Sequence, residues 1–209
     1  DPSAQNKDEG FKVVYSGSKN QVAHSPEELA QYMFEDTDLA TQYLYSGKLS
    51  KWLEDAGFPE YQMQLDEIVN KEFPKDRLAG VLSACYQLNG DLPYRSPAGK
   101  DCFTDDEIVS EIMEAYDNGS LHLEKPNDPF YLFYKTHGMD LSANFAPQFK
   151  KSKWKAFWRL VYTIDADYPF PIYNLETEEI TQCDTIDEVV EALVSQDLFE
   201  FRFEDDEDN

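Results

Sequence analysis

The stretch YQLNGDLPY at residues 86–94 recurs, with changes, as YTIDADYPF at residues 162–170. Both copies read tyrosine, polar, aliphatic, polar, small, aspartate, apolar, proline, aromatic. Each leads through a turn-rich stretch to a second motif, CFTDDEIV at 102–109 and CDTIDEVV at 183–190. A related segment, AHSPEELA at 23–30, stands near the start of the chain without the upstream half. The recurrences predict about three diverged copies of one unit.

The second motif has the chemistry of a helix start. In each copy a Ser or Thr is followed three residues later by Glu, which is the pattern of a capping box. The capping residues, Ser25, Thr104 and Thr185, lie 79 and 81 residues apart, so the unit has a period of about 80 residues. Glutamates at such positions can also serve as catalytic acids, but capping explains all three without further assumption.

Short extended stretches separated by turn residues precede each cap. Their alternating apolar positions predict two-stranded hairpins over residues 11–24, 92–103 and 170–183. Between the hairpins the apolar residues fall at helical spacing. Helices are expected around Leu49, Trp52, Leu53 and Ala56 with Gly57 as terminator, over 39–47 and 130–138, and along an unbroken stripe of Leu78, Val81, Leu82, Cys85 and Leu88. The expected fold is therefore α+β and mainly helical.

This pattern divides the chain into five segments. The expected boundaries are a disordered N-terminal segment at 1–10, repeat unit 1 at 11–91, repeat unit 2 at 92–169, a partial repeat unit 3 at 170–203, and a disordered acidic tail at 204–209. Phe199, Phe201 and Phe203 alternate ahead of that tail and predict a last strand.

Charge narrows the range of partners. The chain carries 42 Asp and Glu against 18 Lys and Arg, a formal net charge of −24. Such a surface repels nucleic-acid phosphates and anionic lipid, and it favours basic partners. No apolar run approaches the roughly 18 residues that a membrane span needs. The three cysteines are odd in number and far apart, which argues against a disulfide framework and favours the reducing cytoplasm.

The residues that usually mark chemistry are sparse. His24, His122 and His137 lie at no zinc-site spacing, and the sequence has no phosphate loop, nucleophile elbow or EF-hand loop. Cys102 and Cys183 each lie two residues before a cap, where a small buried side chain is the simplest interpretation. We therefore expect no catalytic residue, no metal and no cofactor.

One basic stretch interrupts the acidic pattern. Lys151, Lys155 and Arg159 are spaced to share one face of a helix, with Trp and Phe residues on another. This face is the candidate partner-binding surface. The alternative is a solvated basic face that pairs with neighbouring acids.

These observations favour a non-enzymatic protein-interaction or scaffold module, by itself or as part of a larger repeat protein. Its expected partner is another protein, and the charge favours a basic one. One alternative is an acidic decoy that mimics DNA and binds a basic nucleic-acid-binding protein. A second alternative is an enzyme whose carboxylate site leaves no local motif.

Overall fold

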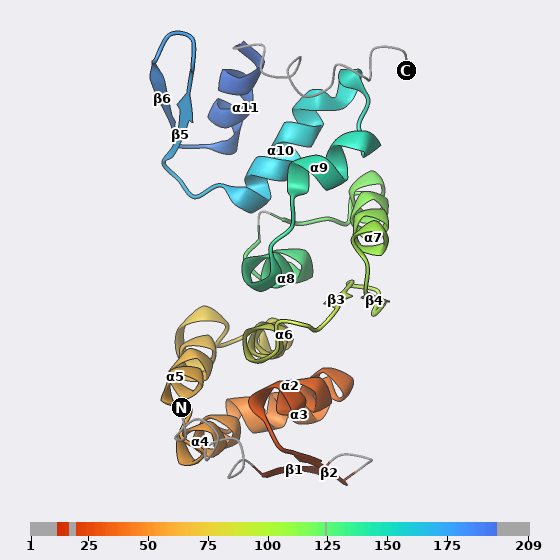
Figure 1. Cartoon of the computed structure of the whole chain (residues 1–209), viewed down its shortest axis with the longest axis vertical. Coiled ribbons are helices and arrows are strands. Elements are labelled where there is room, and N and C mark those ends of the chain that lie inside the picture. Colours follow the sequence, from red (N-terminus) through yellow and green to blue (C-terminus); the bar gives the residue numbers. More distant parts are fainter. Residues whose placement is uncertain (1–11, 17–19, 124, 196–209) are drawn as a thin grey trace. The chain divides into compact units, whose positions relative to one another are not determined.

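A computed structural model describes residues 12–16, 20–123 and 125–195 (Figure 1). The expected disordered segments at 1–10 and 204–209, and the expected strand through Phe199, Phe201 and Phe203, lie outside these residues. The chain forms two compact units. Unit 1 comprises residues 1–101 and 127–138, and unit 2 comprises residues 102–126 and 139–209.

Within the described residues the protein is mainly helical, with ten α-helices and three small two-stranded antiparallel sheets. The three hairpins expected from the sequence are confirmed. They are β1 (Val13–Ser16) with β2 (Asn20–Ala23), β3 (Tyr94–Arg95) with β4 (Asp101–Cys102), and β5 (Phe170–Tyr173) with β6 (Ile180–Cys183). They lead into α2 (Pro26–Glu35), α7 (Asp105–Asp117) and α11 (Ile186–Ser195).

Capping connects each hairpin to its helix. The hydroxyls of Ser25, Thr104 and Thr185 accept hydrogen bonds of 3.1–3.2 Å from the backbone N–H of the Glu three residues later. The three Glu carboxylates reach back to the N–H of the residue before the cap, which is His24, Phe103 or Asp184. A standard capping box would end on the cap residue itself. Here the carboxylate bond extends one residue further, into the end of the hairpin, so that it fixes the angle between strand and helix.

Unit 1 is built around helix α6 (Arg77–Leu88), which contacts α2, α3 (Thr37–Tyr45), α5 (Pro59–Glu67) and α8 (Pro129–His137). A π-helical turn, η1 (Ile68–Glu72), continues α5 and also packs on α6. Gly80 lies where the ring of Tyr45 crosses α6, and a Cβ there would collide with the Tyr45 hydroxyl. Close approach at a glycine lets Tyr45 donate a 2.5 Å hydrogen bond to the carbonyl of Phe73.

The predicted stripe along α6 is wrong at its first residue. Leu78 is 57% exposed, whereas almost every residue from Ala79 to Leu88 is buried. A helix covered on several sides has no single apolar stripe, so the sequence pattern could not show which first-turn residue faces outward. The predicted end of α4 (Lys48–Asp55) is confirmed: Gly57 is left-handed, with φ at 86°, and the Phe58 N–H bonds back to the Leu53 carbonyl.

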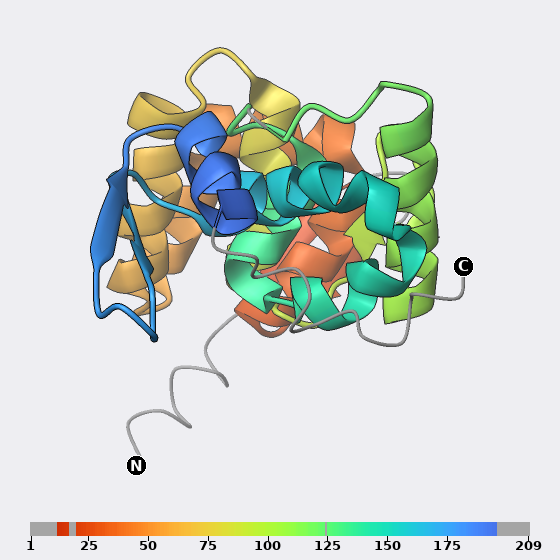
Figure 2. The same ribbon diagram turned by 90° about the horizontal axis from the view of Figure 1, so that it is seen from above.

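Unit 2 contains α7, α9 (Leu141–Phe145), α10 (Trp154–Asp165) and α11, with two short 3₁₀ turns, η2 (Ala146–Gln148) and η3 (Lys151–Lys153). Its core combines many aliphatic side chains with four buried aromatic residues, Phe145, Phe149, Phe157 and Trp158. Helices α10 and α11 pack on each other, and the β5–β6 hairpin stands beside α11 in both views (Figures 1 and 2).

Candidate partner-binding surfaces

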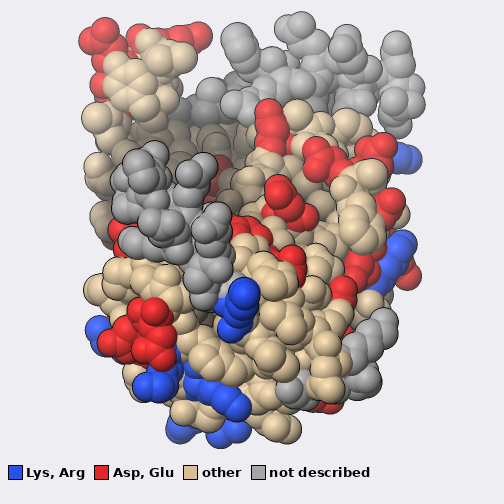
Figure 3. Space-filling model, turned by 60° about the horizontal axis from the view of Figure 1, so that its bottom comes forward, with Lys and Arg blue, Asp and Glu red and all other residues tan. Residues whose placement is uncertain are grey.

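Acidic residues dominate the charged surface. On the face shown in Figure 3, red Asp and Glu side chains outnumber the blue Lys and Arg side chains. None of the helices among the described residues combines the length and apolar composition needed to cross a membrane.

The basic stretch does not form the single helix face that its spacing predicts. Lys151 lies in the 3₁₀ turn η3, and α10 begins only at Trp154. A 3₁₀ turn advances three residues per turn, so spacing counted at 3.6 residues does not carry Lys151 onto the face of the following α-helix. Lys155 and Arg159 do lie one turn apart on α10, and both are exposed.

Arg159 already has a partner in its own unit. Its guanidinium donates a 2.5 Å hydrogen bond to Asp187 at the start of α11, and the two side chains are 51% and 76% exposed. An ion pair this open to solvent adds little stability. It does engage Arg159 in a contact between α10 and α11. This agrees with the alternative interpretation, in which the basic face is solvated and pairs with neighbouring acids. Lys155 makes no ion pair with another described residue.

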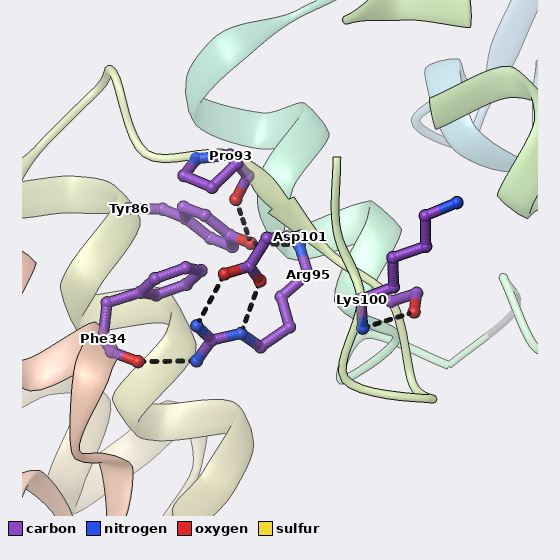
Figure 4. Close-up of polar contacts among 7 residues, drawn as sticks. Phe34, Tyr86, Pro93, Arg95, Lys100 and Asp101 are labelled. Carbon is purple, nitrogen blue, oxygen red and sulfur yellow. Dashed lines mark hydrogen bonds and ion pairs between the residues drawn. The ribbon is translucent and has the colours of Figure 1, made fainter. Parts of the chain in front are cut away.

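The densest polar cluster surrounds Arg95 in unit 1 (Figure 4). Its guanidinium donates to both carboxylate oxygens of Asp101, at 2.7 and 3.0 Å, and to the carbonyl of Phe34 at 2.6 Å. The same guanidinium lies 3.7 Å from the centroid of the Phe34 ring. Tyr86 donates to the Pro93 carbonyl and accepts from the Arg95 N–H, both at 3.1 Å.

This arrangement is structural. Phe34 lies in the last turn of α2, where carbonyl groups lack helical partners and a positive charge is favoured. Burial raises the pKa of the neighbouring Cys85 thiol to about 12 and also raises the pKa of the Tyr86 hydroxyl. Both groups are therefore neutral near neutral pH. The cluster fastens the β3–β4 hairpin to the end of α2.

The β5–β6 hairpin has one covered face and one open face. Phe170 pairs with Cys183, and Ile172 pairs with Thr181, on the face that carries the buried residues Ile172 and Cys183. On the opposite face Tyr173 pairs directly with Ile180, and the two are 50% and 59% exposed.

The turn between these strands adds another exposed apolar residue. Leu175 is 85% exposed, and the Asn174 side chain holds the turn by accepting from the N–H groups of Glu176 and Thr177. We call Tyr173, Leu175 and Ile180 the hairpin patch.

A groove of about 720 Å³ runs along α7 in unit 2. Its floor includes the buried Val109 and the half-buried Met113. Three exposed acidic residues of the same helix, Asp106, Glu114 and Asp117, form one wall. The other wall carries the amides of Asn144 and Gln148, from α9 and η2. Sequence reasoning missed this groove, because helical spacing gives the α7 side but not the segment facing it.

The described residues hold no group of three His, Cys, Asp or Glu side chains arranged to bind a metal ion. All three cysteines are buried free thiols. Cys102 and Cys183 occupy the inward positions expected for them. In the N-terminal hairpin the matching position, two residues before Ser25, holds the buried Ala23, so a small side chain fills this position at all three caps.

Comparison with known proteins gives no relative: no family model, no curated protein and no solved structure matches the chain.

Proposed function

We propose that this chain is a non-enzymatic protein-interaction module, and that the hairpin patch is its main contact surface. The observation that carries the proposal is the direct cross-strand pair of Tyr173 and Ile180. Each side chain is exposed over half or more of its surface, on a face with no covering element among the described residues. Exposed tyrosines that become buried when a partner binds frequently carry much of the binding energy at protein interfaces.

An exposed apolar strand tends to associate with other chains, and this tendency supports the proposal. A two-stranded hairpin has free backbone edges, and an apolar face on it promotes association with other chains. Three glutamates in or next to its turn, Glu176, Glu178 and Glu179, put negative charge beside the patch. With the net charge of −24, they disfavour pairing between copies of this chain and favour a partner of opposite charge.

The test is affinity capture from the native host, with the folded chain as bait and a wash at about 0.5 M salt, where the Debye length is well below 10 Å. The Y173S/I180S variant should lose the partner that survives this wash. The matched control is T181A/Q182A, which changes two exposed residues of the same hairpin. Equal retention by all three baits would exclude the hairpin patch as the contact surface.

The acidic decoy stays a second candidate because of the charge alone. A decoy that holds its partner through charge should bind basic nucleic-acid-binding proteins, release all of them in the salt wash, and be indifferent to Y173S/I180S. The basic stretch also remains a proposed contact surface, now reduced to Lys155 and its neighbours. A Lys155→Glu substitution should weaken binding only if the partner contacts α10.

We also propose that the three hairpin-and-cap units descend from one repeated sequence. Each hairpin leads directly into a capped helix, and each has a small buried residue two positions before the cap. The segments between them differ: α4 and α5 intervene between Gly47 and α6, whereas α9 and the 3₁₀ turns intervene between Gly138 and α10. Variable segments between constant units are typical of repeat proteins that have diverged in their contacts.

A further inference from the structure

Two of the three carboxylates on the acidic wall of the α7 groove are electrostatically unfavourable to the helix itself. Glu114 and Asp117 lie three residues apart on one face in the last turns of α7. Like charges at this spacing repel, and negative charge at a helix C-terminus opposes the helix dipole. The last turn has no basic residue, and neither carboxylate is paired with another described residue. A cationic ligand would relieve both effects.

The rest of the groove indicates what kind of cation it suits. Val109 and Met113 form an apolar floor, which a simple metal ion or a hydrated small cation would not use. Methionine adapts its shape to different apolar side chains. On the opposite wall the Asn144 NH2 group already donates to the Asp140 carbonyl, which leaves its amide oxygen and the Gln148 amide to form hydrogen bonds with a peptide backbone. The volume of about 720 Å³ is within the range of sites that hold drug-sized ligands.

From these features we infer that the α7 groove binds a short basic peptide segment, with one apolar side chain of the segment on Met113 and its Lys or Arg residues on Asp106, Glu114 and Asp117. This surface is separate from the hairpin patch, and the inference does not rest on the proposed function.

The spacing of the carboxylates sets the spacing of the basic residues. Asp106 and Glu114 are eight residues apart on α7, which corresponds to about 12 Å along a helix axis. An extended peptide covers about 3.3 Å per residue, so basic residues about four positions apart span the two carboxylates. An apolar residue midway between them falls over the floor between Val109 and Met113, where its side chain can reach Met113, and a further basic residue reaches Asp117.

The probe that fits this spacing is the fluorescein-labelled hexapeptide Arg-Ala-Leu-Ala-Arg-Lys, measured by fluorescence anisotropy with the full chain at about 0.15 M salt, where the Debye length is about 8 Å. We expect saturable binding, and a dissociation constant at least about tenfold higher for E114Q/D117N, because two charge-assisted contacts are lost. The matched control is E176Q/E179Q, which removes the same charge at the same spacing from the β5–β6 hairpin and should change affinity less than about twofold.

Folding cannot account for the expected loss. E114Q/D117N removes repulsion from the end of α7, so its unfolding temperature should equal or exceed that of the unmodified chain. Met113→Gln should lower the affinity for the probe. It should lower the affinity for a second probe, with Ser in place of Leu, much less. Equal affinity for a scrambled peptide of the same composition, or equal losses in E114Q/D117N and E176Q/E179Q, would overturn the inference and leave only general attraction to an acidic surface.

Discussion

The β3–β4 and β5–β6 hairpins follow the same nine-residue motif and end in equivalent caps, yet the protein uses them differently. In the first, Arg95 and Asp101 bind each other and the Phe34 carbonyl, and this ties the hairpin to α2. In the second, an apolar pair stands open on one face. One local sequence can therefore supply either a fixed joint or a free surface.

Two positions account for the difference. Arg95 follows the final aromatic of its motif, and Pro171 follows the final aromatic of the other. Asp101 lies three residues before Thr104, and Gln182 lies three residues before Thr185. Pro171 and Gln182 are cross-strand partners, but they have no charges with which to form a bidentate pair. The β5–β6 hairpin thus lacks the chemistry that holds the β3–β4 hairpin in place.

The largest expected effect comes from breaking the fixed joint. Arg95→Ala removes the pair with Asp101, the bond to the Phe34 carbonyl and the contact with the Phe34 ring, and should destabilise unit 1 by about 2–3 kcal/mol. In the β5–β6 hairpin, Gln182→Ala at the position that matches Asp101 should change stability by less than about 0.5 kcal/mol, because the side chain is exposed. Amide hydrogen exchange of α2 and α6 measures the effect of Arg95→Ala, and exchange of α11 measures the effect of Gln182→Ala. Equal effects would show that the two hairpins are held alike.

The next largest effect should be a loss of stability in unit 1 at alkaline pH. The pKa of Cys85 is raised by burial to about 12, from about 9 in the unfolded chain. Its neutral form therefore stabilises unit 1 below pH 9, and that contribution is lost as the pH rises from 9 toward 12, by about 1 kcal/mol per pH unit. The pKa of Tyr86 is also raised by burial, which adds to the loss at higher pH.

Urea unfolding at pH 8 and 10.5 checks this expectation. Cys85→Ala should flatten the decline in unfolding midpoint over that interval. Cys183→Ala is the parallel measurement in the β5–β6 hairpin, because burial raises the pKa of that thiol as well. A steeper decline in the Cys85→Ala variant would contradict the assignment.

The caps should behave alike despite the different hairpins. Thr104→Ala and Thr185→Ala each remove one acceptor of a backbone N–H and should cost about 1 kcal/mol in their own helices. Thr→Ser at either position keeps the hydroxyl and should restore most of the loss. Hydrogen exchange in the first turns of α7 and α11 reports the effect. A cost at one cap only would weaken the proposal that the units share an origin.

The smallest effect on stability should come from the hairpin patch. Y173S/I180S changes two exposed side chains and should shift unfolding by less than about 0.5 kcal/mol, while abolishing capture of a salt-resistant partner. Thermal unfolding followed by circular dichroism measures the first quantity. A drop of several degrees would mean that the open face supports the fold.

What could be predicted from the sequence was the local part of this comparison. Hairpins and caps follow from residues close together in the chain, so the three strand pairs and the hydroxyl caps at Ser25, Thr104 and Thr185 were predicted correctly. The attachment of Arg95 to Phe34 joins residues 61 apart. The opposite wall of the α7 groove likewise comes from a later segment. Such pairings depend on tertiary packing, which propensity and periodicity do not encode. The 3₁₀ turn at Lys151 was missed because basic residues lie on both sides of the start of α10, so residue type does not mark where the α-helix begins.

The chain crosses from one unit to the other three times, since unit 1 resumes at residue 127 and ends at residue 138. The returning segment is α8, whose Phe130 and Phe133 rings pack against Tyr94, and Phe133 also against Tyr86. During synthesis, residues 1–101 therefore emerge from the ribosome before α8, the helix that completes the core of unit 1. Until α8 emerges, the aromatic side of α6 stays open to chaperones and proteases. A continuous fragment that stops at residue 101 carries the same defect permanently, so dissection of this protein requires joining 127–138 back to the first segment.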